Sequence, residues 1–86
     1  MARFRFGVSV MPRDGILDPQ GRAVEAALPQ LGAQSVHDVR VGRRVELNVE
    51  ATEEAQAHAL VERLASELLA NPLVERWHIE RLDAGP

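Results

Sequence analysis

Three kinds of side chain in this sequence could take part in chemistry: histidines, serines and paired carboxylates. His37, His58 and His78 are too far apart to pair at i+3 or i+4 on one helix, the spacing that a helical metal site requires. Ser9 and Ser66 stand in no G-x-S-x-G sequence, and no glycine-rich phosphate-binding motif occurs. The sequence therefore predicts no catalytic, cofactor-binding or metal-binding residues on this chain.

Asp14 and Asp18 are the one pair of carboxylates that could do general acid–base work, because they flank a short apolar loop. Each has a structural explanation as well. Asp14 precedes Gly15 in a turn sequence. Asp18 can cap the free N–H groups of a helix whose first residue is Pro19, where the missing proline N–H breaks no bond. We therefore expect Asp18 and Pro19 to be structural residues.

The composition is that of one small domain. The chain has 86 residues, which we assign to a single domain over residues 1–82 and a frayed tail over 83–86. It has no cysteine, so disulfides and thiolate metal sites are excluded, and its net charge of −3 does not favour nucleic-acid binding. No apolar run approaches the ~20 residues of a membrane span, and the first ten residues do not resemble a signal peptide. We expect a soluble, cytoplasmic protein.

Residues 39–51, VRVGRRVELNVEA, give the strongest structural signal. Valine, leucine and alanine alternate with polar residues, which is typical of a strand with one buried face, and only Arg43 interrupts the apolar side. Thirteen residues would span about 43 Å, which is long for a domain of this size. Either residues 42–44 form a hairpin loop, or one strand bends near Gly42 and its far half pairs with another chain. We favour the bent strand, because the alternation never breaks phase.

Our candidates for a partner interface are this glycine and the arginines around it: Arg40, Gly42, Arg43 and Arg44. Arg43 falls on the apolar face, where an unpaired charge is costly, so it must reach past the sheet edge or pair with an acid. It lies either in a solvated bend or at an interface, where it would anchor a partner's carboxylate.

The other elements must position these residues. Strands are predicted over residues 2–10 and 73–82. A first helix is predicted from Pro19 to Gly32, kinked or loosened by Pro29. A second helix is predicted from the cap Thr52 to the stop at Asn71 and Pro72. The order β-α-β-α-β indicates an α+β fold, with two amphipathic helices packed on one face of an antiparallel sheet. This architecture is a relative of the ferredoxin-like folds, and the long central strand would extend the sheet across a dimer.

Three segments together resemble one known family. Residues 16–25 (ILDPQGRAVE), 36–47 (VHDVRVGRRVEL) and 68–75 (LLANPLVE) resemble the signature segments of the PurS family, in the same order and with the same spacing. Three positions depart from the family pattern: Arg43 stands where lysine is usual, Arg44 where an aromatic residue is frequent, and Pro29 is also unusual.

The PurS family is the small subunit of phosphoribosylformylglycinamidine synthase, in de novo purine biosynthesis. The resemblance implies a non-catalytic protein that forms a homodimer or tetramer. It would bridge a glutaminase subunit and a large synthetase subunit, and assist the transfer of ammonia between them. ATP and Mg²⁺ would be used by the synthetase partner. An alternative from the residues alone is an ACT-like regulatory domain that binds a small molecule.

Overall fold

The structure, a computed structural model, describes residues 1–83, so most of the tail predicted at 83–86 lies outside the described residues. The elements in chain order are β1 (Ala2–Pro12), α1 (Pro19–Ala27), a 3₁₀ turn (Leu28–Leu31), β2 (Arg43–Ala51), α2 (Glu54–Leu64), a π-helical turn (Ala65–Leu69) and β3 (Glu75–Leu82). The α+β class and the order of the elements are confirmed.

The three strands form one antiparallel sheet with β1 in the middle, in the order β2-β1-β3. In the register, Val8 of β1 lies opposite Val45 of β2 and Ile79 of β3. β1 extends two residues beyond its predicted end. Its last residue is Pro12, and the end of a ladder is a position where a missing N–H is tolerated.

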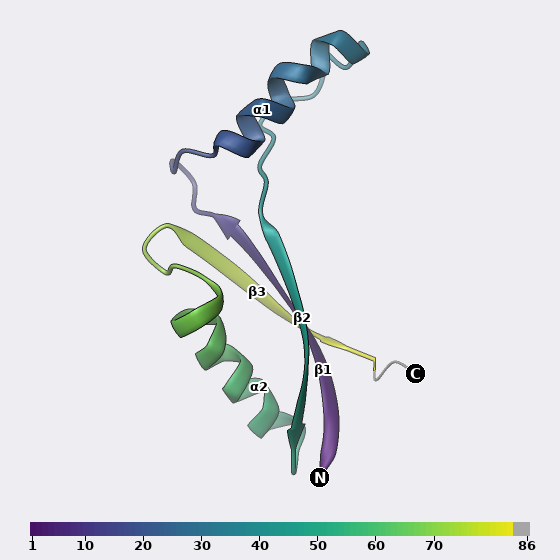
Figure 1. Ribbon diagram of the computed structural model, residues 1–86, viewed down its shortest axis with the longest axis vertical. Helices are drawn as coiled ribbons and strands as arrows, with labels where there is room; N and C mark the ends of the chain where they lie inside the picture. The colour runs from purple at the N-terminus through teal and green to yellow at the C-terminus, as the bar shows by residue number, and fades with distance from the viewer. Residues whose placement is uncertain (84–86) are drawn as a thin grey trace.

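The core lies on one face of the sheet, under α2 (Figure 1). Phe6, Val8 and Val10 of β1 are fully buried, and from α2 so are Ala57 and Val61. Burying a valine or phenylalanine side chain contributes about 1.5–3 kcal/mol. These contacts with the central strand therefore account for the position of α2.

The N-terminus of α2 differs from the prediction. Thr52 was the expected N-cap, but the cap position is occupied by Glu53, whose side chain makes no capping bond. The Thr52 hydroxyl donates instead to Gln56 Oε1 at 2.7 Å, and the Thr52 N–H donates to the same oxygen at 3.0 Å. The Thr52 hydroxyl is thus bound to the glutamine of the first turn and does not cap the N–H groups of the helix.

The C-terminal end of α2 agrees with the prediction. The Ala70 N–H closes the last π turn on the Ala65 carbonyl, and the chain is extended at Ala70, just before Asn71 and Pro72. The following strand begins at Glu75, two residues later than predicted. Asn71 Oδ1 accepts a hydrogen bond from the Leu73 N–H at 3.1 Å, which holds this segment in a turn.

The central strand is shorter than predicted, and the hairpin interpretation is wrong. β2 begins at Arg43, which lies opposite Val10, and Arg44 follows opposite Ser9. Both arginines are thus strand residues rather than loop residues. Residues 39–42 lead into β2 but lie outside the ladder, whose last pair is Arg43 with Val10, although β1 continues to Pro12 beside β3.

The position of the first helix also differs from the expectation that both helices pack on the sheet. In the isolated chain, α1 stands beyond one end of the sheet, and only α2 lies alongside it (Figure 1). Gly21 is the only buried residue of α1. The loosening predicted at Pro29 is present as the 3₁₀ turn, which ends at Gly32 with a left-handed φ of 74°. We call residues 13–42, which leave the sheet and return to it, the arm.

Candidate functional site

The described residues do not assemble a site for general acid–base or metal chemistry. Within residues 1–83, no group of three or more His, Cys, Asp or Glu side chains is placed to hold a metal ion. His58, predicted on the solvated side of its helix, is exposed but also packs its ring edge-on against Phe6, with centroids 6.0 Å apart. Over the same residues, no helix is both long and apolar enough to cross a membrane.

The carboxylate of Asp18 is held by the backbone. Its Oδ1 accepts from the Gly21 N–H at 3.0 Å, and its Oδ2 accepts from the Val41 N–H at 2.9 Å. These two hydrogen bonds, with a smaller contribution from the Arg40 charge, lower the pKa of Asp18 although burial opposes the shift. A carboxylate kept ionised in this way is poorly suited to donate a proton near neutral pH. The geometry favours the structural interpretation of Asp18 over an acid–base pair with Asp14.

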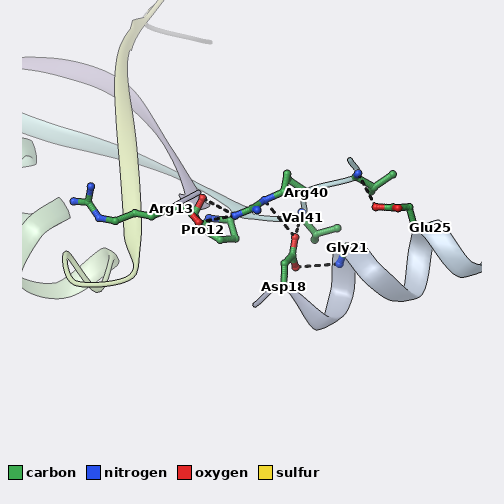
Figure 2. A network of polar contacts seen from close by, with 8 residues as sticks. Pro12, Arg13, Asp18, Gly21, Glu25, Arg40 and Val41 are labelled. Atoms are coloured by element: carbon green, nitrogen blue, oxygen red, sulfur yellow. Dashed lines mark hydrogen bonds and ion pairs between the residues drawn. The ribbon is translucent and has the colours of Figure 1, made fainter. Parts of the chain in front are cut away.

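Arg40, the first interface candidate, turns back toward the end of β1 (Figure 2). Its Nη2 donates to the Pro12 carbonyl at 3.1 Å and to the Arg13 carbonyl at 2.8 Å. Its Nε lies 3.9 Å from Asp18 Oδ2. Arg40 therefore connects the segment by which the arm returns to the sheet, residues 39–42, to the segment where the arm begins.

Gly42 lies directly against the end of β1. A Cβ at this position would overlap the carbonyl oxygen of Val10 and the sulfur of Met11. The glycine is thus required by a close approach between two backbone segments rather than by a turn.

Arg43 lies on the apolar face, as predicted, and its charge is paired within the chain. Its guanidinium binds the Glu75 carboxylate through two hydrogen bonds, at 2.7 and 3.0 Å, and donates a third to the Leu69 carbonyl. The Arg43 hydrogen bond is the main reason that the pKa of Glu75 is lowered, and a bond from the Asn71 N–H adds to it. The sequence predicted that Arg43 either reaches past the sheet edge or pairs with an acid. The structure shows the pairing, and the acid, Glu75, belongs to this chain.

Arg44 lies on the opposite, solvated face of the sheet. It bridges all three strands, with ion pairs to Glu46 of β2 at 3.0 Å and Glu80 of β3 at 2.6 Å, and a bond to Ser9 of β1 at 3.1 Å. Its guanidinium covers Gly7, where a Cβ would overlap it. The structure therefore brings Arg40, Gly42 and Arg43 to one end of the sheet and leaves Arg44 apart from them.

Sequence reasoning missed a second feature of this end of the molecule, which is the exposed apolar surface of the arm. The exposed fractions are 69% for Leu17, 45% for Val24, 80% for Leu31 and 47% for Val36. The stripe predicted to face the core thus remains uncovered in the single chain. Apolar residues gathered on one projecting element are typical of a surface that binds another protein.

Comparisons with known proteins agree on one family. The family model described as "PurS: Phosphoribosylformylglycinamidine (FGAM) synthase" matches residues 5–83. Curated phosphoribosylformylglycinamidine synthase subunits PurS are 45% identical over 74 residues in Mycobacterium leprae (86% of this chain, 90% of the relative) and 33% identical over 82 residues in Thermotoga maritima (95% and 100%).

Solved structures give the same answer for the fold. A chain in the structure of PurLQS from Thermotoga maritima superposes with a TM-score of 0.87 at 33% identity, covering 95% of this chain and 100% of that one. The structure of Thermus thermophilus PurS gives a TM-score of 0.80 at 36% identity, covering 94% and 99%. The ACT-like alternative finds no support in these comparisons. With a family match across nearly its whole length and relatives of the same size and fold, the chain belongs to the PurS family of phosphoribosylformylglycinamidine synthase.

Proposed function

We propose that this chain is the small, non-catalytic subunit of a cytoplasmic phosphoribosylformylglycinamidine synthase complex. In this role it bridges the glutaminase and the ATP-dependent synthetase and assists the transfer of ammonia between them. The observation that carries the proposal is the superposition, over nearly all residues, on a chain of the PurLQS structure from Thermotoga maritima. We assign ATP and Mg²⁺ to the synthetase partner and no cofactor to this chain.

The physical reason for such a subunit is the chemistry of ammonia. Ammonia released at one active site must reach a second one before it is protonated or lost to bulk water. A rigid protein that closes the gap between two enzymes meets this need without contributing catalytic groups. An elongated molecule of 52 × 32 × 14 Å, with a sheet at one end and a projecting helix at the other, suits that role.

The test is a reconstitution of the glutaminase and the synthetase with and without this protein. We expect glutamine-dependent product formation to require it, while product formation from added ammonium salt continues in its absence. Loss of the ammonia-dependent rate as well would mean that the protein organises the synthetase site itself. No change in either rate would overturn the proposal.

We further propose that the protein works as a homo-oligomer in which the arm of one chain packs against a second copy. The radius of gyration is 16.6 Å, whereas a compact chain of this length has one of about 12 Å. The difference reflects an arm that carries apolar residues but lies away from its own core. A two-fold pair would cover both arms at once. Residues 39–42, which lie outside the ladder, are then available to extend the sheet toward the second chain, as the sequence predicts.

Leu31→Asp is expected to dissociate the oligomer to single chains, because it places a charge in the apolar surface of the arm. The matched control is Leu68→Asp, at a leucine that is 73% exposed but belongs to the π-helical turn after α2 rather than to the arm. Sedimentation velocity on both variants and the parent measures the effect. If Leu68→Asp dissociates the oligomer and Leu31→Asp does not, the arm is not the contact surface.

A further inference from the structure

The orientation of α1 relative to the sheet is set by polar contacts rather than by an apolar core (Figure 2). The Asp18 carboxylate joins the first turn of the helix, through Gly21, to the returning segment, through Val41. One turn further along, Glu25 Oε1 accepts a hydrogen bond from the Val39 N–H at 3.0 Å. Two carboxylates on the same helix therefore bind alternate N–H groups of one extended segment.

Gly21 allows this close contact. A Cβ at this position would overlap the Asp18 carboxylate and would lie 2.5 Å from the Val39 carbonyl oxygen. Glycine inside a helix is less stable than alanine by roughly 1 kcal/mol. Here it lets the helix backbone lie directly on the returning segment, which explains why Gly21 is the only buried residue of α1.

The returning segment is itself bound to the sheet. Arg40 donates to the carbonyl groups of Pro12 and Arg13, and its Nε lies near the Asp18 carboxylate. The Asp18 side chain is only 9% exposed at this junction of three segments. These contacts form a continuous connection from α1, through residues 39–41, to the end of β1.

We propose that Asp18 is a positioning residue: together with Glu25 and Arg40 it forms a latch that fixes the angle of the arm, so that its apolar surface is already oriented for a second copy. This inference rests on the proposed self-association. A freely rotating arm would be in the binding orientation only part of the time, and the apparent dissociation constant rises in inverse proportion to that fraction. Because a two-fold contact uses two arms, this loss of affinity would apply once for each arm.

Asp18→Ser separates the latch from the helix cap. Serine caps helices about as well as aspartate, so α1 is expected to persist. Its single, shorter hydroxyl cannot accept from both the Gly21 and the Val41 N–H groups, so the connection to the returning segment is lost. Asp14→Ser is the matched control, because it removes a second acidic side chain from the same loop and leaves the latch in place.

The chain has no cysteine, so a pair of introduced cysteines can carry unique spin labels. Gln30→Cys reports the arm and Asn48→Cys reports the sheet, since both positions are exposed. Double electron–electron resonance, with labelled protein diluted into excess unlabelled protein, gives the distance distribution between them. We expect a narrow distribution for the parent and for Asp14→Ser, and a broad one for Asp18→Ser at unchanged far-UV circular dichroism. The same measurements in the Leu31→Asp background report the latch without a partner chain.

Self-association is the second measurement. We expect Asp18→Ser to raise the dissociation constant about tenfold or more, equivalent to at least ~1.4 kcal/mol. A narrow distribution in Asp18→Ser would overturn the latch. A broad distribution with unchanged affinity would overturn its role in assembly. If Leu31→Asp leaves the oligomer intact, it is the proposed arm contact that fails, and the distance distributions still decide whether Asp18 orients the arm.

Acidification gives an independent readout of the latch. Asp18 shares its groove with Asp14, Arg22, Glu25, Asp38 and Arg40. Because the pKa of Asp18 is lowered from its ordinary value of 3.8, the ionised carboxylate favours the latched arm at any pH above 3.8. That preference is lost as the pH falls below 3.8 through the folded-state pKa. The parent distribution should therefore stay equally narrow at pH 7 and pH 5, whereas broadening between these values would contradict an ionised latch.

Discussion

Phe6→Ala is expected to destabilise the protein by about 3–5 kcal/mol, which is the usual cost of truncating a buried phenylalanine. Phe6 is fully buried at the centre of β1, and its ring packs against His58 of α2. A domain of 86 residues has a total stability of roughly 4–13 kcal/mol. The variant should therefore lose a large part of its stability, measured as a lower midpoint of urea denaturation followed by circular dichroism.

Phe4→Ala is the matched control for this prediction. Phe4 lies two residues earlier on the same face of β1, but it is only half-buried and its ring lies 5.2 Å from the Arg81 guanidinium carbon. The loss should be clearly smaller than at Phe6. Equal losses at the two positions would mean that the core is not centred on the contact between β1 and α2.

Periodicity was sufficient to predict the sheet. The alternation of Phe4, Phe6, Val8 and Val10 places the same side chains on the buried face that the structure places there. The cap at Asp18, the loosened turn at Pro29 and the helix stop before Asn71 depend on contacts within a few residues. Such local signals are read directly from the sequence because no distant segment competes with them.

The position of the arm could not be predicted in the same way. An apolar stripe on a helix shows that the helix has a surface to cover, but not which surface covers it. Val24 and Leu31 satisfied the pattern of a core-facing helix, yet both are exposed in the single chain. The core position on the sheet is already filled by α2. The alternation at Val39 and Val41 likewise continues beyond Arg43, which forms the last pair of the ladder between β1 and β2.

The pairing of side chains that are far apart in the sequence could not be predicted either. The sequence required an acid for Arg43, but thirteen acidic residues are present and nothing local selects Glu75, which lies 32 positions away. The antiparallel register decides the choice, because Arg43 and Glu75 lie at the ends of the two strands that flank β1. The contact between α1 and the returning segment had one weak signal in the sequence, which is Gly21, since a glycine inside a predicted helix often has a packing reason.

Gly42→Ala is expected to weaken the attachment of the arm to the sheet more than an alanine substitution at any other glycine of this region. The new Cβ would overlap the Val10 carbonyl oxygen, a backbone atom of the central strand β1. Relief requires residues 39–42 to move away from β1, which breaks the bonds from Arg40 to the Pro12 and Arg13 carbonyls. Overpacking of this kind typically costs 1–3 kcal/mol, and a rigid backbone neighbour places Gly42 at the upper end, near ~3 kcal/mol.

The control for Gly42 is Gly32→Ala, at the end of the 3₁₀ turn. Gly32 has a φ of 74°, and no atom lies within 4 Å of its ideal Cβ, so its substitution costs only the left-handed conformation, about 1 kcal/mol. Hydrogen exchange separates the two effects: Gly42→Ala should deprotect the Val39 and Val41 amides, which Glu25 and Asp18 bind, while the β1–β3 ladder stays protected. Because only Gly42→Ala releases the arm from the sheet, it alone should also weaken self-association and glutamine-dependent synthesis. Equal behaviour of the two variants would show that the contact at Gly42 does not hold the arm.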